Sequence, residues 1–495
     1  MTDTLQRPAD PDAHDTTVHH ARHLVAGERP DPLDAPVLER RDPATGDPTS
    51  TAPVGDDVTV AAAVAAARAA APDWARTPAA ERAAALARAA DAVEAVAEQL
   101  AEDSRLDMGR PPALARDGVA AGVATMREYA VLGPLHRGRR LNGSPDAWDV
   151  MELRPRGVAA VVTAWNDPVA ATVGLLAAAL VTGNTVVWKP SERAVRTSDR
   201  LAGLLAASFP PGVVNVVHGD ATTGALLVEQ HVDVVAHVGS TAAGRAIAAA
   251  AARTGAHTLL ENGGKDPLVV DRGLDPQWVA QQIALGGLIN SGQLCTAVER
   301  VYVHTDAYDA VREALLTEVE RWAPGGEQAI GPLVDTAHRD AVHAHVSAAR
   351  DAGARVLRGG EVADGPGAFY PPTVLEDVPA DAAVLTEETF GPVLPLVRVE
   401  DVDEGLRLAG AGRYGLAATV LTADLVVARR ACTALDVGTV KVNDVFGGAP
   451  GGAATPRRGS GTGLGYGPEL LDEMTAVTVC HLGPPRAAAP SPAAS

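Results

Sequence analysis

The chain has little cysteine and no long apolar run. Its three cysteines, Cys295, Cys432 and Cys480, are too few and too far apart for a disulfide framework or a zinc site, so no metal is expected. No window approaches the ~20 apolar residues that a membrane helix needs, and the first thirty residues lack the apolar centre of a secretory signal. We therefore expect a cytoplasmic protein without a membrane segment.

Positive charge and aromatic residues are also scarce. In 495 residues, 42 Lys and Arg stand against 62 Asp and Glu, a net charge of -20. Such a charge repels phosphate backbones and anionic lipid heads, so neither nucleic acid nor a membrane surface is expected as a partner. Aromatic residues make up 3% of the chain and hydrophobic residues 46%, so the interior must be built from Ala, Val and Leu. The length predicts two or three packed units.

Lysine occurs only at positions 189, 265 and 441. Where a chain uses Arg almost everywhere, a Lys suggests a site that needs a compact ammonium group. Chance survival on the surface explains the three lysines equally well until their context is added.

The two ends and an Ala-rich region have no strand pattern. Residues 1–30 and 483–495 are polar or rich in Pro and Ala, and we expect them to be disordered tails. The Ala-rich region predicts two or three helices that are broken around Pro72 and Pro78 and end near Gly109.

From residue 157, short apolar runs alternate with helical segments. Strands are expected at 157–165, 184–190, 212–220, 232–239 and 256–264, with helices between them. This order implies βαβ crossovers and a parallel sheet with helices on both faces. Residues 277–443 repeat the alternation and predict a second α/β domain, with Cys295 near its beginning.

Ligands of such sheets bind beyond the carboxyl ends of the strands. That rule singles out Trp165, Asn166, Lys189, Glu192, Gly219, Gly239, Ser240 and Glu261. Gly239, Ser240 and the following Gly244 open a helix, where backbone amides can bind a pyrophosphate, although a Gly-Ser helix start is more often only a turn with an N-cap.

Three pairs of alternatives stay open on residue type alone. Lys189 and Glu192 can bind ribose hydroxyls or a phosphate, or they can form a solvated helix start. Glu261 ends an apolar strand and suits a general base, or it can be a capping residue. Cys295 follows a Gly-rich turn whose amides can stabilise a thiolate, yet a lone cysteine is more often a buried inert thiol.

Ten strings taken together resemble the NAD(P)-dependent aldehyde dehydrogenase superfamily over residues 35–480. They occur in the family's order, at suitable separations: "DPATG", "LDMGRP", "TAWNDP", "GNTVVWKPSE", "VGSTAAGR", "ENGGKDP", "SGQLCT", "EETFGPV", "YGLAATV" and "GTVKVN". The resemblance implies a Rossmann-like parallel-sheet cofactor domain at 31–133 and 152–260 and an α/β catalytic domain at 261–465. It also implies a small oligomerisation element at 134–151 and 466–482, which makes a homodimer or homotetramer.

The resemblance further implies oxidation of an aldehyde to a carboxylic acid. Cys295 matches the nucleophile that forms a thiohemiacetal and then a thioester, and Asn166 matches the side-chain donor of the oxyanion hole. Glu261 matches the base that activates the hydrolytic water. The matches on the cofactor side are Trp165, Lys189, Glu192, Gly239, Ser240, Gly244, Glu388 and Phe390. Glu192 favours NAD, and NADP use stays open.

The chain departs from the family pattern at three places. Asp167 stands where many relatives carry an aromatic residue that walls the substrate tunnel, and it suggests a polar or amino-bearing aldehyde. Asn262 replaces an apolar residue beside the base. The segment 451–471, "GGAATPRRGSGTGLGYGPELL", differs from the family's glycine-rich segment. Leu294 and Thr296 suggest a modest aliphatic pocket.

Two other functions are weighed against this one. A CoA-acylating semialdehyde dehydrogenase would pass the acyl group to CoA, and the base at Glu261 argues for water instead. A non-catalytic nucleotide-binding relative would keep the fold alone, and the joint presence of Cys295, Asn166, Glu261 and Glu388 argues against it.

Overall fold

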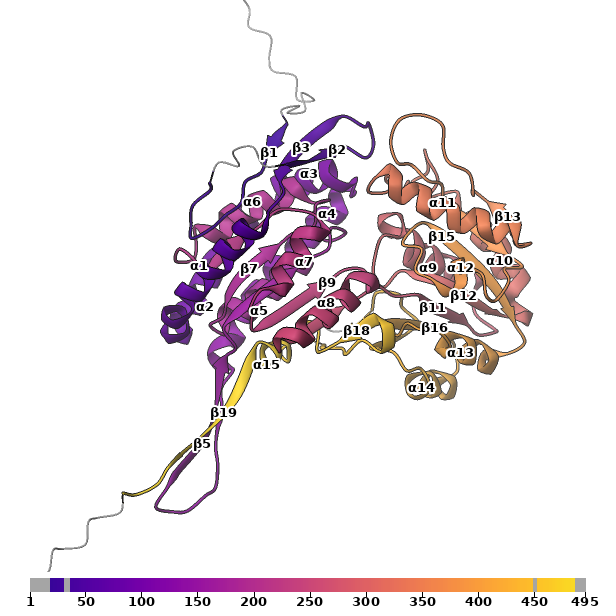
Figure 1. Cartoon of the computed structure of the whole chain (residues 1–495). Coiled ribbons are helices and arrows are strands. Elements are labelled where there is room, and N and C mark those ends of the chain that lie inside the picture. The colour runs from indigo at the N-terminus through magenta and orange to yellow at the C-terminus, as the bar shows by residue number, and fades with distance from the viewer. Residues whose placement is uncertain (1–17, 31–35, 448–451, 486–495) are drawn as a thin grey trace, which may run out of the picture.

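A computed structural model describes residues 18–30, 36–447 and 452–485. Two α/β domains lie side by side, and a long antiparallel arm projects from beneath the first of them (Figure 1). The predicted fold class, two α/β units with parallel sheets, is confirmed.

The first domain is built on a six-stranded sheet. Its order is β18-β10-β9-β6-β7-β8, and only the short edge strand β18 runs antiparallel. The strands are β6 (Val158–Val162), β7 (Thr185–Lys189), β8 (Val214–Val216), β9 (Val234–Val238), β10 (His257–Glu261) and β18 (Gly461–Thr462). The crossover helices are α5 (Ala170–Val181), α6 (Val195–Ala206), α7 (Ala221–Glu229) and α8 (Thr241–Thr254). All five strands and four helices predicted from residue 157 onward are confirmed within a few residues.

Four helices precede this sheet in the chain, and one predicted break is wrong. They are α1 (Asp57–Arg76), α2 (Ala79–Glu94), α3 (Ala97–Met108) and α4 (Pro112–Leu132). The first packs on the sheet, and the other three pack on one another and on α5 and α6. Pro72 lies inside α1 on its exposed side, where a carbonyl without an N–H partner can bond to water. Tertiary contacts hold the turn that follows, because buried Trp74 donates its indole N–H to the Leu180 carbonyl at 3.0 Å. The predicted breaks at Pro78 and Gly109 are confirmed.

The second domain contains a seven-stranded sheet in the order β13-β14-β15-β12-β11-β16-β17. Its strands are β11 (Asp266–Val270), β12 (Val298–His304), β13 (Arg355–Arg358), β14 (Thr373–Glu376), β15 (Val393–Val399), β16 (Ala417–Leu421) and β17 (Thr439–Val442). Its helices are α9 (Pro276–Leu288), η2 (Ile289–Gly292), α10 (Thr305–Val319), α11 (Thr336–Asp351), α12 (Ala383–Thr386), α13 (Val402–Gly410), α14 (Leu425–Ala434) and η3 (Arg458–Ser460). The chain then returns to the first sheet through β18.

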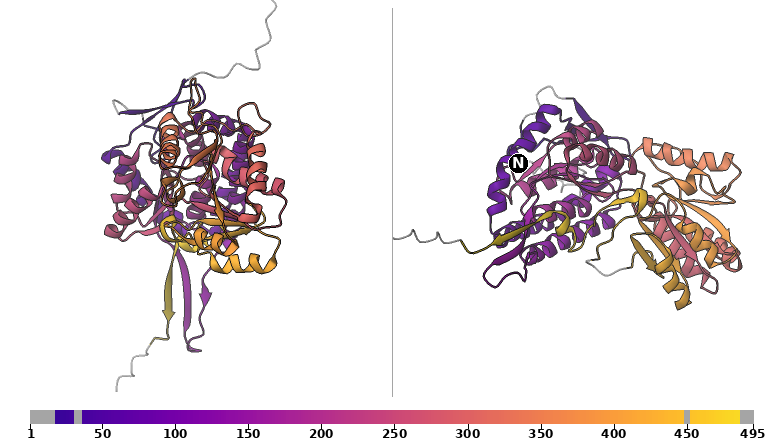
Figure 2. Two further views of the ribbon diagram at one scale, coloured as in Figure 1. Left: turned by 90° about the vertical axis from the view of Figure 1, so that its right-hand side faces the viewer. Right: turned by 60° about the horizontal axis from the view of Figure 1, so that its bottom comes forward.

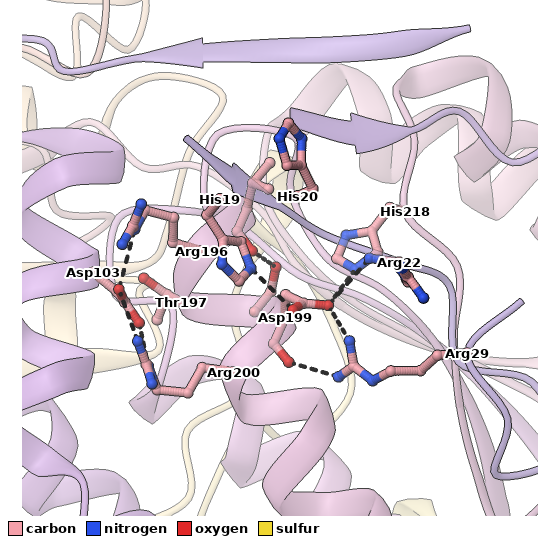
Figure 3. A network of polar contacts seen from close by, with 12 residues as sticks. His19, His20, Arg22, Arg29, Asp103, Arg196, Thr197, Asp199, Arg200 and His218 are labelled. Carbon is pink, nitrogen blue, oxygen red and sulfur yellow. Dashed lines mark hydrogen bonds and ion pairs between the residues drawn. The ribbon is translucent and has the colours of Figure 1, made fainter. Parts of the chain in front are cut away.

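The amino-terminal segment packs against the first domain, so the predicted tail is wrong for residues 18–30. β1 (His19–His20) pairs with β3 (Pro48–Pro53), which also pairs with β2 (Val37–Arg41). Leu24 is buried and bridges to Val216. The Asp199 carboxylate accepts hydrogen bonds from His19 and Arg29 of this segment (Figure 3). The segment looks disordered in sequence because its partners lie about 30 to 200 residues away. The remainder of both predicted tails, 1–17 and 486–495, lies outside the described residues.

The arm is a small antiparallel sheet. It contains β4 (Arg139–Arg140), β5 (Trp148–Pro155) and β19 (Thr475–Leu482), in the order β19-β5-β4. Short helices η1 (Gly133–Leu135) and α15 (Leu470–Glu473) connect it to the first domain. It extends well clear of both domains (Figure 2), and it exposes Trp148, Val477, Val479 and Leu482. No helix in the described ranges is long and apolar enough to cross a membrane.

Candidate active site

A cavity of about 560 Å³ lies where the two domains meet. The first domain contributes the carboxyl ends of β6, β9 and β10, and the second contributes the loop before β12, helix α11 and the loop after α12. Eight of the predicted site residues line this one cavity: Trp165, Asn166, Gly239, Ser240, Glu261, Cys295, Glu388 and Phe390. Lys189, Glu192 and Gly244 are not among its lining residues.

The Cys295 loop is held by a strained turn. Asn290, Ser291 and Gly292 all have positive φ angles, of 51°, 58° and 73°. Such angles are rare for residues other than glycine, and they persist only where the surroundings fix them. Here the Ser291 hydroxyl donates to the Gly331 carbonyl at 2.7 Å, and the Gln293 side chain accepts the Val334 N–H at 2.9 Å. The turn therefore presents Cys295 to the cavity from a rigid base.

The surroundings of Cys295 favour its thiol form over the thiolate. Burial raises its pKa well above the usual range, and the nearby Glu261, Asp266 and Glu388 raise it further. The sequence predicts that loop amides favour the thiolate. One backbone hydrogen bond, from Thr296, does lower the pKa. Because burial dominates, the thiol needs a base before it can attack an electrophile.

Glu261 is suited to be that base. It ends β10 and lines both the main cavity and a smaller one of about 190 Å³. Burial raises the pKa of its carboxyl group to about 7. An acid with a pKa near neutrality can both take up and release a proton at physiological pH.

Asn166 is fixed through its backbone, and its side chain is left for the cavity. Its carbonyl oxygen accepts a hydrogen bond from the buried Arg110 guanidinium, and the Asn290 side chain approaches the same oxygen at 3.5 Å. No hydrogen bond of the Asn166 side chain to another described residue is seen, so its amide is available to an oxygen of a bound molecule.

An aromatic cluster forms another part of the cavity wall. Trp165 and Phe390 meet edge to face with ring centroids 5.6 Å apart, and His338 lies 6.1 Å from each. The His338 ring contacts the Phe390 carbonyl at 2.8 Å, and Phe390 has a φ of 54°. Arg193 lies over Trp165 and forms an ion pair with Asp335, which also caps α11. The cluster therefore joins the two domains beside the cavity.

Glu388 and the Gly239 turn lie near this wall. Glu388 accepts the Gly264 N–H at 3.0 Å, and burial raises its pKa to about 8. A Cβ at Gly239 would come within 2.6 Å of the His237 ring, so this turn requires glycine. Ser240 caps α8 by accepting the Ala243 N–H at 3.2 Å. The Gly-Ser turn is thus an N-cap that also lines the cavity, and pyrophosphate binding by its amides stays a prediction.

Gly244 has a packing role. A Cβ there would come within 1.9 Å of the Asn262 side-chain oxygen, because α8 lies directly against the residue after Glu261. Asn262 donates to the Gly459 carbonyl at 3.1 Å, which joins β10 to the carboxyl-terminal segment.

The three lysines are all partly or fully buried in polar contacts. Lys189 lies 3.3 Å from Glu192, and burial lowers its pKa. Lys265 contacts Glu299 at 2.5 Å and Thr389 at 3.0 Å, which fixes the loop that carries Glu388. Lys441 donates to the Val445 carbonyl at 2.6 Å. None of them is a chance surface residue.

Sequence reasoning missed several lining residues, namely Thr125, Arg193, His338, His345 and Tyr466. His338 and His345 lie seven positions apart on α11, a spacing that places them on one helix face and that could have marked them. Tyr466 follows a glycine-rich segment without periodicity, and no local pattern indicates that it reaches the cavity. No cluster of three or more metal-binding side chains occurs in the described part of the chain.

Known proteins resemble this chain over nearly its whole length. The model of the aldehyde dehydrogenase family matches residues 33–480. Hydroxyisobutyraldehyde dehydrogenase of Mycolicibacterium austroafricanum is 35% identical over 463 residues, 90% of each chain. The NAD-dependent aldehyde dehydrogenase of Sinorhizobium meliloti superposes with a TM-score of 0.90 at 32% identity, covering 96% of each chain. The lactaldehyde dehydrogenase of Escherichia coli gives 0.91 at 31% identity, covering 94% of this chain and 100% of its own.

Proposed function

The chain belongs to the aldehyde dehydrogenase family, and on that premise we propose that Cys295, Asn166 and Glu261 carry out its reaction. It is an oxidoreductase that acts on aldehydes and uses NAD(P)+. One observation supports the proposed roles above all. A partly buried thiol, an uncommitted amide and an acid with a pKa of about 7 come from three separate elements and line one cavity.

In the first half of the reaction, Cys295 loses its proton to Glu261 and its sulfur attacks the carbonyl carbon. The carbonyl oxygen becomes an oxyanion, which accepts hydrogen bonds from the Asn166 side chain and the Cys295 N–H. Such a donor contributes about 3 kcal/mol to the lowering of the barrier. Bound NAD(P)+ supplies the hydride acceptor. When the oxyanion collapses, the carbon loses hydride and a thioester remains on Cys295.

Before the second half, Glu261 releases the Cys295 proton to solvent, which a pKa of about 7 allows. In the second half, the ionised Glu261 takes a proton from water while the water oxygen attacks the thioester carbon. The bond from carbon to sulfur breaks, the carboxylic acid leaves, and the Cys295 sulfur leaves as a thiolate that regains a proton. The two cavities that Glu261 borders give water access to it from either side.

The residues that line the cavity suit a dinucleotide cofactor. Trp165, Glu388 and Phe390 would hold the nicotinamide side, and the amides of the Gly239–Ser240 turn would hold the pyrophosphate. Lys189 and Glu192 would bind the adenosine ribose beyond the cavity. We propose NAD as the preferred cofactor, with NADP as the alternative, because the Glu192 carboxylate opposes a 2'-phosphate and one solved relative is NAD-dependent.

Steady-state assays test these roles. Wild type should form NADH from an aldehyde and NAD+ without CoA, with the free acid as product. Cys295→Ser should lose NADH formation and still bind NADH, as followed by fluorescence. Unchanged turnover in this variant would refute the assigned nucleophile, and a strict CoA requirement would favour the CoA-acylating alternative.

The assembly and its location are part of the same proposal. We propose that residues 134–151 and 466–482 form an oligomerisation element and that the protein is a homodimer or homotetramer. The apolar side chains exposed on the arm support this, since exposed patches of this kind mark interfaces. Three free cysteines support a reducing, cytoplasmic location. We also keep the proposed division into a cofactor domain at 31–133 and 152–260 and a catalytic domain at 261–465.

A further inference from the structure

Asp167 places a carboxylate on the cavity wall directly after the proposed oxyanion donor, Asn166. Its sequence position suggests either a polar or an amino-bearing aldehyde. The two differ in what the carboxylate must do, because an amino-bearing substrate needs an unpaired negative charge and a neutral polar substrate needs only a hydrogen-bond acceptor.

The negative charge of Asp167 is already balanced within the protein. Arg110 donates from Nη2 to Asp167 Oδ2 at 3.0 Å, and its side chain is only 3% exposed, against 29% for Asp167. The same guanidinium donates to the carbonyls of Leu114 and Asn166. Because Arg110 is fixed at several points and stays charged at all relevant pH values, the pair is neutral toward a bound molecule.

The second oxygen of Asp167 is free to accept. No described residue donates a hydrogen bond to Oδ1, which lies against Gly118 of α4, and the small residues Ala170 and Ala171 line the same cavity as Asp167. Two other polar groups on the lining have already used their protons, since the Thr125 hydroxyl donates to Ala121 and the Tyr466 hydroxyl donates to Ala171. This part of the cavity therefore offers acceptors, and a complementary ligand brings donors.

The cavity offers little to a charged aldehyde. Among the described residues that line it, Arg193 is the only lysine or arginine, and it is paired with Asp335 at 2.9 Å. A carboxylate on the substrate would find no free counter-ion among the described lining residues, and it would share the cavity with Glu261 and Glu388. A cationic group would find Asp167 already neutralised by Arg110.

We propose that Asp167 is a specificity-determining residue and that the substrate is a small, uncharged aldehyde with a hydroxyl group a few bonds from the carbonyl. The hydroxyl donates to Asp167 Oδ1 while Asn166 binds the carbonyl oxygen. This inference rests on the proposed function. A hydrogen bond to a charged acceptor is worth about a 10- to 100-fold preference in kcat/KM for the hydroxylated aldehyde over its deoxy counterpart.

The test compares matched aldehyde pairs that differ only by a hydroxyl, such as glycolaldehyde with acetaldehyde and 3-hydroxypropanal with propanal. Concentrations are those of the free carbonyl, measured by NMR, because the members of a pair hydrate to different extents. Wild type should prefer the hydroxylated member of at least one pair by about 10-fold or more. Succinic semialdehyde and 3-aminopropanal should be poorer substrates than that aldehyde.

Two variants and one control test whether Asp167 causes the preference for the hydroxylated aldehyde. In Arg110→Met/Asp167→Leu, both partners are replaced by apolar groups of similar size, so no buried charge is left unpaired, and the preference should fall to about 1. Because the preference is a ratio within one variant, any loss of turnover cancels. Asp167→Asn keeps an acceptor oxygen and should keep part of the preference. The exposed pair Arg253 and Glu229, 3.1 Å apart, gives the control R253M/E229L, which should keep the wild-type ratio.

The inference is overturned if wild type oxidises both members of every pair equally, if the double variant keeps the preference, or if 3-aminopropanal is the best substrate. These outcomes all need an active enzyme. If wild type forms NADH from none of these aldehydes, the proposed function itself fails.

Discussion

Glu261→Gln should separate the two halves of the reaction. The substitution keeps the size of the side chain and removes its ability to take up a proton. A general base contributes about 100- to 10,000-fold to the rate of the step that it serves, so steady-state turnover should fall by about that factor. The thioester should then accumulate, because hydride loss precedes hydrolysis.

Burial of Glu261 sets the pH dependence. With a pKa of about 7, about a tenth of the groups are ionised at pH 6 and about nine tenths at pH 8. Wild-type turnover should therefore rise about tenfold between these pH values, with a midpoint near pH 7. The Gln variant should lack this rise.

The raised pKa of Glu261 also affects the stability of the folded protein. The folded state binds the Glu261 proton more tightly than the unfolded state does, so the contribution of this group to stability is highest below about pH 4.5, falls as pH rises to about 7 and is level above that. The full cost of ionising the buried acid is about 3 kcal/mol. Relative to wild type, Glu261→Gln should therefore gain several degrees in Tm between pH 5 and pH 8.

Stopped-flow absorbance of NADH tests whether the thioester accumulates in Glu261→Gln. Because burial favours the protonated form of the Cys295 thiol and Glu261 is its proposed base, the burst in the Gln variant should be slower but should still reach about one NADH per active site. Glu229→Gln, on the exposed side of α7, is the matched control and should behave as wild type. Turnover within about threefold of wild type, or a flat wild-type profile from pH 6 to 8, would show that Glu261 is not the base.

Three further predictions concern how the site is held. Asp335→Asn keeps the cap on α11 but removes the charge that faces Arg193 of the other domain. The KM for NAD+ should therefore rise several-fold, with kcat little changed. An unaltered KM in initial-rate assays would argue against a role for this ion pair. Gly292→Ala places a Cβ 2.3 Å from the Gly391 carbonyl at a φ of 73°, so activity and Tm should both fall, and Cys295 labelling should show whether its loop has moved. Leu24→Ala should cost about 2 to 5 kcal/mol if residues 18–30 are part of the folded domain, and a disordered tail would show no change in thermal unfolding.

Local patterns in the sequence are enough to predict the strands and helices of the first domain. Val158–Val162 and Val234–Val238 are fully or almost fully apolar, as expected for strands that are covered on both faces. The failures occur where distant contacts outweigh local preference. Pro72 stays helical because Trp74 is anchored to Leu180, and residues 18–30 are ordered because β3 and Asp199 bind them.

The sequence by itself determined the two α/β units, their strand order along the chain and, through ordered family strings, the family and the candidate residues. Each of these depends on residue type and spacing, which the sequence contains directly. Only the tertiary structure decided that Arg110 neutralises Asp167, that Gly244 packs against Asn262 and that Tyr466 joins the cavity. The charge, pKa and free hydrogen-bonding capacity of a side chain depend on its neighbours in space, and the neighbours of Cys295 come from segments up to about 170 residues away.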